Sequence, residues 1–198
     1  MENHLSALVS RHVAETQHVI SAMLVDQHLL SAVQAAAEIC IECIRRGGKL
    51  LLAGNGGSAA EAQHFAGEFV GKFALTRAGL PAMALTTDTS VLTAIGNDYG
   101  TGEIFARQLQ ALGKPGDVFI ALSTSGKSPN ILRALEEAKS LGLSCVGFTG
   151  NLGGPMKDSC DHIIEVPSSE TPRIQEGHLI LGHILCSLVE EAIFGIHA

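Results

Sequence analysis

The sequence predicts an α/β protein with three layers, in which helices cover both faces of an open, doubly wound and mostly parallel five-stranded sheet. Short apolar runs alternate with longer helical segments over most of the chain. These runs are continuously apolar, which is typical of strands that are buried on both faces. The composition agrees, because 46% of the 198 residues are hydrophobic and 22 are glycine, a residue that suits tight strand-to-helix turns. We expect one domain over residues 1–198.

Two helices are expected before the sheet, over about residues 1–46. Residues 1–24 carry apolar side chains at roughly helical spacing. A second helix is expected from about Gln27 to Arg46. It ends before Gly47-Gly48, which is a stop signal for helices. Helices of this length need a surface to cover, and that surface is either their own domain or a partner in a homo-oligomer.

Strands and helices alternate from residue 49 onward. The five expected strands are 49–53, 82–85, 118–122, 143–148 and 162–166. The first of the expected helices follows the turn that begins at Gly54 and ends at about residue 69. The others span residues 103–112, 129–141 and 171–194. Segments rich in Gly, Ser, Thr and Asn follow the strands, at the sheet edge where open α/β folds bind their ligands.

Charge and composition exclude several function classes. The formal net charge is −7 and aromatic residues make up only 4%, so a nucleic-acid reader or a binder of anionic lipid is not indicated. Any phosphate must therefore be held by local donors. The N-terminal segment lacks the basic start and apolar core of a signal peptide, and we identified no run of about 20 apolar residues. The cytoplasm is the expected location.

The five cysteines do not predict a disulfide framework, because their number is odd and their spacing scattered. Cys40 and Cys43 form a C-x-x-C motif, which raises a redox or zinc site as an alternative. They lie in a periodic apolar run with no second Cys/His pair at zinc spacing, which favours a buried helix position.

The strongest local signal is the hydroxyl-rich loop Ser123–Ser128. It follows an apolar strand and precedes a helix that begins at Pro129, a residue suited to the first helical position. Ser128 is placed to cap that helix, whose N-terminus offers free N–H groups and a partial positive charge. Four hydroxyls exceed the needs of capping, so the loop predicts a phosphate site.

Two further segments are ambiguous when read alone. The turn that begins at Gly54 fits the dinucleotide pattern G-x-G-x-x-A, but the acidic residue expected about 20 positions later is missing and Asp88 lies about 30 on. The turn could equally present N–H groups and Asn55 to sugar hydroxyls. Asn97-Asp98-Tyr99 is expected to be a loop, either contacting a polyol or forming an ordinary Asx turn.

Polar residues on two predicted helices suggest a metal or acid–base site. His64 and Glu68 are four apart, so both lie on one helix face. On the last helix, Gln175 and His183 are offset by roughly 80° and can converge on one ligand, while His178 projects about 140° away from His183. Spacing alone leaves the alternatives open, because isolated polar pairs and histidines in apolar stripes are more often solvated or core residues.

In combination, these segments resemble the sugar isomerase (SIS) family over nearly the whole chain. The resemblance is carried by Ala53–Ala60, Gln63-His64, Glu68, Leu85–Asp88, Ala94–Tyr99, Ser123–Asn130 and Ile174–His178. It is nearest to the bacterial isomerases of sedoheptulose 7-phosphate. It implies a SIS fold and an aldose–ketose isomerase that acts through an ene-diolate, at the first step of ADP- or GDP-heptose biosynthesis for lipopolysaccharide or capsule.

The resemblance also implies particular residues. It implies one Zn²⁺ per subunit held by His64, Glu68, Gln175 and His183, with Glu68 and His183 as the catalytic pair. It implies substrate contacts from Asn55, Gly56, Gly57, Glu68, Asn97, Asp98, Ser123, Thr124, Ser125, Ser128 and Gln175. It further implies a homotetramer with sites at subunit interfaces, which would give the N-terminal helices a role.

Two other readings compete with the isomerase. Some members of this family are non-catalytic adaptors that bind the replication initiator, but they typically lack the catalytic Glu and the last-helix His, which this chain keeps at Glu68 and His183. An NAD(P)-linked oxidoreductase would explain the Gly54 turn but would leave Ser123–Ser128 without a role.

Overall fold

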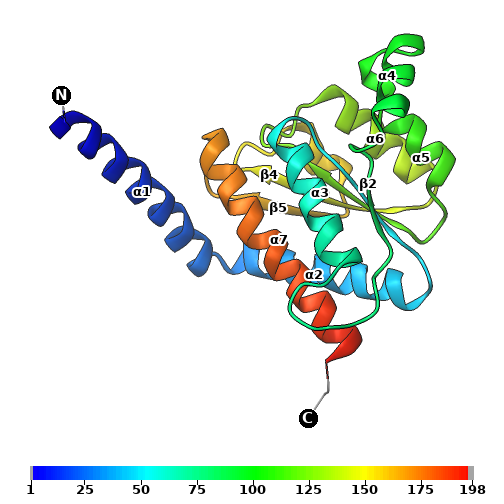
Figure 1. Ribbon diagram of the computed structural model, residues 1–198, viewed down its shortest axis with the longest axis horizontal. Helices are drawn as coiled ribbons and strands as arrows, with labels where there is room; N and C mark the ends of the chain where they lie inside the picture. Colours follow the sequence, from blue (N-terminus) through cyan, green and yellow to red (C-terminus); the bar gives the residue numbers. More distant parts are fainter. Residues whose placement is uncertain (1, 196–198) are drawn as a thin grey trace.

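The computed structural model describes residues 2–195 and has three layers, with a single five-stranded sheet between helices (Figure 1). The strand order is β2-β1-β3-β4-β5 and each of these neighbouring pairs is parallel. The strands are β1 (Leu50–Ala53), β2 (Ala82–Ala84), β3 (Val118–Leu122), β4 (Ser144–Gly150) and β5 (His162–Val166). The predicted fold class is confirmed.

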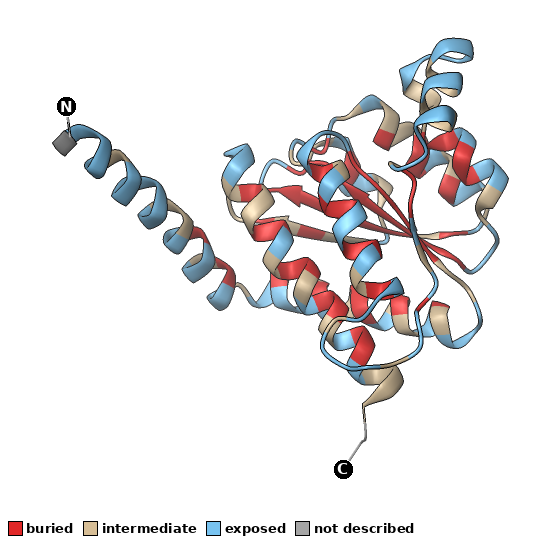
Figure 2. Cartoon of the chain, viewed as in Figure 1, coloured by how far each residue is buried: buried red, intermediate tan, exposed pale blue. Residues whose placement is uncertain are grey.

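Alternation along the strands divides the core between the two faces of the sheet. Leu50 and Leu52 pack on one side, whereas Leu51 and Ala53 pack on the other. The first side is covered by α2 (Gln27–Arg45), α3 (Gly57–Val70) and α7 (Thr171–Phe194). The second is covered by α5 (Ala106–Leu112) and α6 (Pro129–Ser140). Both central strands β1 and β3 are buried throughout, as Figure 2 shows.

The strand order reverses direction between β1 and β3. The chain passes from β1 outward to β2, whereas β3, β4 and β5 extend the sheet in the other direction. Such a switch point opens a crevice beyond the carboxyl ends of the two strands, where ligands bind in this architecture. The segments that follow β1 and β3 are the Gly54 turn and the loop Ser123–Ser128. The topology therefore brings both predicted ligand segments to one crevice.

Most predicted elements are confirmed to within two or three residues, and most exceptions lie between β2 and β3. The expected loop at Asn97-Asp98-Tyr99 is wrong, because Asn97 and Asp98 form the last turn of α4 (Thr89–Asp98). Asp88 starts this helix by accepting the N–H of Val91 at 3.0 Å. The helix expected at 103–112 splits into a 3₁₀ turn η1 (Thr101–Glu103) and α5, and a further 3₁₀ turn η2 (Gly154–Ser159) precedes β5.

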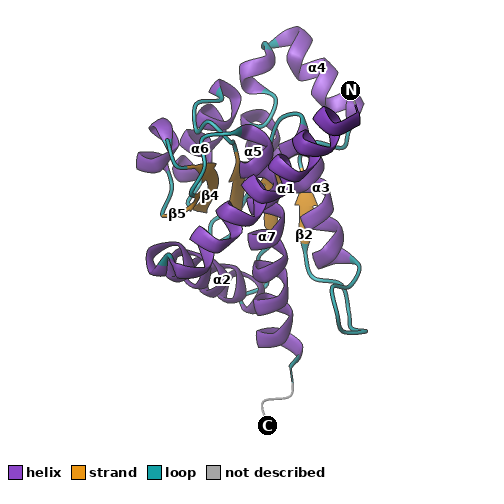
Figure 3. Ribbon diagram, turned by 90° about the vertical axis from the view of Figure 1, so that its left-hand side faces the viewer, coloured by secondary structure: helices purple, strands orange, loops and turns teal. Residues whose placement is uncertain are grey.

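Helix α1 (Glu2–Val25) projects from the body of the molecule (Figures 1 and 3), and its second half meets the start of α7, where Thr16 donates to Oε2 of Glu176 at 2.8 Å. Its predicted apolar stripe is present but largely uncovered. Val19 and Met23 are buried, whereas Leu5, Val9 and Val13 are each at least 60% exposed. The chain alone thus does not cover this face of α1.

One described helix, α7, has the length and mean hydropathy of a membrane-spanning segment, contrary to the expectation that no segment does. The pair α1 and α2 meets the same criterion only if it is taken together across its 75° bend. Core helices of soluble proteins pass the same test. In α7 the buried residues pack on the sheet, among them Ile174, Leu181, Leu185 and Val189.

Candidate active site

Three of the predicted metal ligands meet between α3 and α7. The Nε2 atoms of His64 and His183 lie 2.7 Å apart, and Nε2 of His64 lies 3.6 Å from Oε1 of Glu68. One donor atom from each residue falls within 4.8 Å of the others. Two imidazole nitrogens and a carboxylate oxygen that converge on one point are a donor set that suits a divalent transition metal. The described residues thus contain a candidate metal cluster, named below the donor cluster.

Close packing of α3 on α7 brings the donor cluster together. Gly182, the residue before His183, faces the ring of Phe65, the residue after His64. A Cβ at Gly182 would overlap that ring, so the two helices reach this separation only because position 182 has no side chain. The cluster is half-open to solvent, since His64 is exposed and Glu68 and His183 are partly buried.

Gln175, the fourth predicted ligand, lies higher on the same pair of helices. Its side-chain amide lies against Gly57 in the first turn of α3, where a Cβ would overlap it. Gln175 therefore faces the first turn of α3, two helical turns before His64. The structure does not bring its amide into the donor cluster.

The loop Ser123–Ser128 joins β3 to α6 as predicted, but its capping differs from the expectation. Ser128 occupies the N-cap position without a side-chain bond to the helix, and its hydroxyl instead bonds Oγ of Ser123 at 2.9 Å. Oγ of Ser125 accepts the N–H of Lys127 at 3.2 Å. Pro129 has no N–H, and the N–H groups of Ile131 and Leu132 donate to the backbone oxygen of Ser128 at 3.1 and 3.0 Å. Among the first residues of α6 this leaves the N–H of Asn130 for an anion.

The two ligand segments of the crevice are tied to each other. Asn55 and Asn130 exchange reciprocal side-chain hydrogen bonds of 2.9 and 2.8 Å. Asn55, Ser128, Asn130 and Thr101 share a hollow of about 350 Å³. Asn130 lies in a motif quoted above but was given no role there, because nothing in the sequence shows that it pairs with a residue 75 positions away.

Asn97 and Asp98 are less clearly part of this site. Both are exposed at the end of α4, and their one side-chain hydrogen bond within the described residues joins them to each other at 2.8 Å. The end of α4 is nevertheless close to the crevice along the chain. The 3₁₀ turn η1 follows α4 after two residues, and its Thr101 lines the hollow beside Asn55.

His178 does not join the donor cluster. It is fully buried on α7, packs edge-on against Phe148, and its Nδ1 lies 3.7 Å from Oε2 of Glu61, which is nearly buried. Neither ring nitrogen has a hydrogen-bond partner in the described structure. The sequence did not single out Glu61, because an acidic residue in a helix predicts no buried partner by itself.

Cys40 and Cys43 are buried on α2 and, like the other three cysteines, are free. Burial raises the pKa of the Cys43 thiol to about 11 and moves that of Cys40 in the same direction. The expected buried helix position is confirmed.

Comparison with known proteins gives the family. The family model of the SIS domain matches residues 12–150, which include the sheet through β4 and both segments at the switch point. The phosphoheptose isomerase of Burkholderia pseudomallei (strain 1710b) is 64% identical over 195 residues, covering 98% of this chain and 99% of that one. The enzyme of the same name from Aneurinibacillus thermoaerophilus is 57% identical over 94% of both chains.

A solved structure agrees. The phosphoheptose isomerase of Neisseria gonorrhoeae superposes with a TM-score of 0.88 at 40% identity, covering 94% of this chain and 99% of that one. These matches include α7, which the SIS match does not reach. The chain therefore belongs to the SIS family and, within it, to the phosphoheptose isomerases. The relatives named here are isomerases over nearly their full length, so the non-catalytic adaptor is not favoured.

Proposed function

We propose that the protein converts D-sedoheptulose 7-phosphate to D-glycero-D-manno-heptose 7-phosphate, the first step of ADP- or GDP-heptose biosynthesis. The distance between the crevice and the donor cluster carries this proposal. Gly57 and His64 are seven residues apart on α3, or roughly 10 Å. A seven-carbon chain with a terminal phosphate is of similar length, about 10 Å when its single bonds near 1.5 Å are extended. A substrate with phosphate at one end and a carbonyl at the other matches this spacing.

The crevice would bind the phosphate and the nearby hydroxyls. Hydroxyls and N–H groups at the start of α6 can hold a phosphate without a basic cluster. Asn97 and Asp98 would contact sugar hydroxyls from the side of the crevice that η1 lines. The proposed contacts are Asn55, Gly56, Gly57, Asn97, Asp98, Ser123, Thr124, Ser125 and Ser128, with Gln175 beside Gly57 and Glu68 at the carbonyl end.

We propose one Zn²⁺ per subunit, held by His64, Glu68, Gln175 and His183. The convergence of two imidazoles and a carboxylate supports it. When bound, the ion would act as a Lewis acid toward the carbonyl and the oxygen on which negative charge develops. The amide of Gln175 is an unusual ligand and lies against Gly57, two helical turns from His64 along α3, so its ligation rests on the family resemblance.

The isomerisation requires a base beside the carbon chain and a group that serves the oxygens. No hydrogen bond engages the Glu68 carboxylate in the described structure, which leaves an oxygen free to take the proton from one carbon and return it to the next. The imidazole of His183 would move the proton between the two oxygens, which lie on neighbouring carbons, through the ring nitrogen that does not hold the metal. Glu68 would loosen from the metal during this step, since one oxygen cannot both ligate and act as base.

Two substitutions test these roles. Glu68→Gln and His183→Gln should each reduce turnover by at least about 100-fold, the usual scale for loss of a general acid or base. Glu136→Gln, exposed on α6, and His162→Gln, at the start of β5, are matched controls. Wild-type turnover in Glu68→Gln or His183→Gln would contradict the assignments, provided that the controls are also active.

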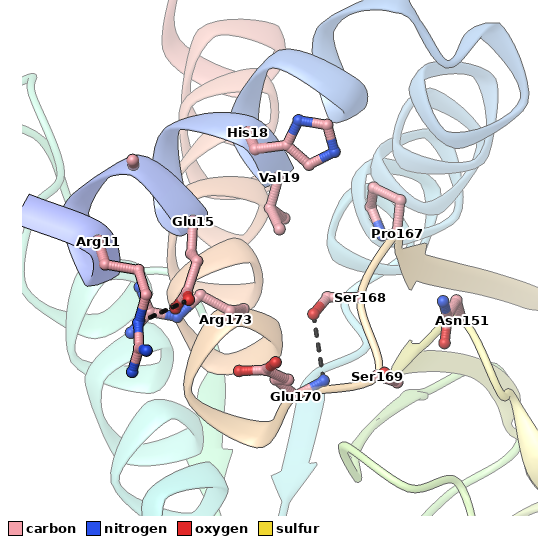
Figure 4. A pocket seen from close by; sticks show the side chains of 11 residues that line it. Arg11, Glu15, His18, Val19, Asn151, Pro167, Ser168, Ser169, Glu170 and Arg173 are labelled. Atoms are coloured by element: carbon pink, nitrogen blue, oxygen red, sulfur yellow. Dashed lines mark hydrogen bonds and ion pairs between the residues drawn. The ribbon is translucent and has the colours of Figure 1, made fainter. Parts of the chain in front are cut away.

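We also propose that the chain is one SIS domain that assembles as a homotetramer in the cytoplasm, with α1 and α2 in the assembly. The uncovered apolar face of α1 supports this, because a partner of the same kind would bury it. A hollow of about 520 Å³ lies between α1 and the segment before α7 (Figure 4). Arg173 anchors α1 at this hollow by donating to the backbone oxygen of His12 at 2.6 Å. Light scattering on purified protein would test the tetramer.

A further inference from the structure

A buried ion pair holds the segment that connects α3 to β2. Glu190, on the last turns of α7, is 2% exposed, and its carboxylate lies 2.8 Å from Nε of Arg77. The same carboxylate accepts the backbone N–H groups of Phe73, Ala74 and Leu75 at 3.0, 2.8 and 2.9 Å. Four donors on one carboxylate fix three consecutive residues of this connection to α7.

The other partner of the pair fixes the end of α3. The guanidinium of Arg77 donates to the backbone oxygen of Glu68 at 2.9 Å and to that of Phe69 at 2.7 Å. These carbonyls belong to the last turn of α3, where helical partners run out. Arg77 therefore caps the helix end at the residue that supplies the carboxylate of the donor cluster.

Glu190 also acts on His183, the member of the donor cluster that lies on α7. Phe73, whose N–H is held by Glu190, places its ring 5.7 Å from the ring of His183, centroid to centroid. Phe65 packs on the same imidazole from α3 at 6.5 Å. The orientation of His183 is thus limited by two aromatic rings, one of which depends on Glu190.

We propose that Arg77 and Glu190 are positioning residues for the donor cluster, which fix Glu68 and His183 relative to each other so that the cluster is preorganised for a divalent metal. Neither side chain bonds a donor atom of the cluster. Arg77 acts through the backbone at the end of α3, and Glu190 acts through Phe73. The inference deepens the metal site proposed above and rests on it. Groups that orient metal ligands commonly change metal affinity by about 10- to 100-fold when they are removed.

The chain offers a matched control in the residue before β3. Asp117 is 3% exposed, pairs with Lys49, and accepts the backbone N–H groups of Lys49 and Lys114, each at 2.9 Å. It therefore resembles Glu190 in burial, charge pairing and backbone contacts. Among the described residues its side-chain bonds go to Lys49 and Lys114, neither of which lies in α3, in α7 or in the connection between α3 and β2.

The test compares metal affinity and stability in full-length variants. Zn²⁺ affinity is measured by competition with a chromophoric chelator, and folding by urea denaturation. Glu190→Gln, Arg77→Lys and Asp117→Asn should all lower stability. Only the first two should weaken Zn²⁺ binding, by about 10-fold or more. Phe73→Leu, which keeps the backbone bond to Glu190 but removes the ring, should weaken it as well and serves if the ion-pair variants do not fold.

Three results would overturn the proposal. The first is unchanged Zn²⁺ affinity in folded Glu190→Gln, Arg77→Lys and Phe73→Leu proteins while the wild type binds, which would refute the positioning roles alone. The second is an equal loss of affinity in Asp117→Asn, which would make the effect a general consequence of lost stability. The third is the absence of Zn²⁺ binding by the wild type, which would refute the proposed metal site and this inference with it.

Discussion

The carboxylate of Glu190 should make stability depend on pH in a way that one substitution removes. Burial by itself would raise the pKa of this group, but the N–H groups of Ala74, Leu75 and Phe73 and the guanidinium of Arg77 outweigh burial. The pKa falls from 4.5 to about 2. At about 1.4 kcal/mol per pH unit, this lowering corresponds to roughly 3 kcal/mol of folding free energy.

The sign follows from the direction of the change. Because the folded-state pKa is depressed, the contribution is present above about pH 4.5 and is lost as the pH falls toward about 2. The difference in unfolding free energy between the wild type and Glu190→Gln should therefore shrink by roughly 2 kcal/mol between pH 5 and pH 3. Urea denaturation at both pH values measures it.

A control separates this carboxylate from the general effect of acid. Glu191 is the next residue on α7 and is exposed, so Glu191→Gln should change stability by less than about 0.5 kcal/mol at either pH. A difference between the wild type and Glu190→Gln that stays constant from pH 5 to pH 3 would refute the reasoning. It would mean that the four donors do not hold the carboxylate in its charged form.

Three further predictions concern packing, the crevice and the thiols. Gly182→Ala should destabilise the protein by about 1–3 kcal/mol by overpacking against Phe65, and should weaken metal binding by separating α3 from α7; urea denaturation and metal titration measure the two effects. Asn130→Ala should release Asn55 and raise KM for the sugar phosphate more than it lowers kcat, as initial-rate kinetics would show; a pure kcat effect would count against a binding role. Burial raises the pKa of Cys145, Cys160 and Cys186 to about 12, so an aromatic disulfide reagent at pH 8 should label the five thiols slowly in the folded protein and rapidly in urea.

The strands and the longest helices were predictable because their sequence signals are strong. The third and fifth strands and the last helix begin and end at the expected residues, since each is a continuous apolar or periodic run between clear breakers. Helix α4 was missed because its apolar stretch, Val91–Ile95, is short and none of its residues is buried. The capping residue Asp88 is a local signal for where it starts.

The site was predictable as a set of positions but not as an arrangement. Spacing put His64 and Glu68 on one helix face, and the family resemblance added Gln175 and His183. The contact between the two histidines spans 119 positions, so it depends on the tertiary packing around Gly182. The bond from Arg77 to Glu190 spans 113 positions, and neither residue carries a local motif. Long-range polar pairs of this kind follow from the fold, and no local pattern encodes them.

The most direct test of the central claim is conversion of sedoheptulose 7-phosphate by metal-replete protein, followed by NMR of the sugar carbons. We expect the ketose to convert to the aldose 7-phosphate, a chelator to abolish the conversion, and added Zn²⁺ to restore it. Conversion that persists after the metal has been removed to undetectable levels would contradict the metal site but not the isomerase. Absence of conversion by folded, metal-replete protein would contradict the proposed function and favour a sugar-phosphate-binding role without catalysis.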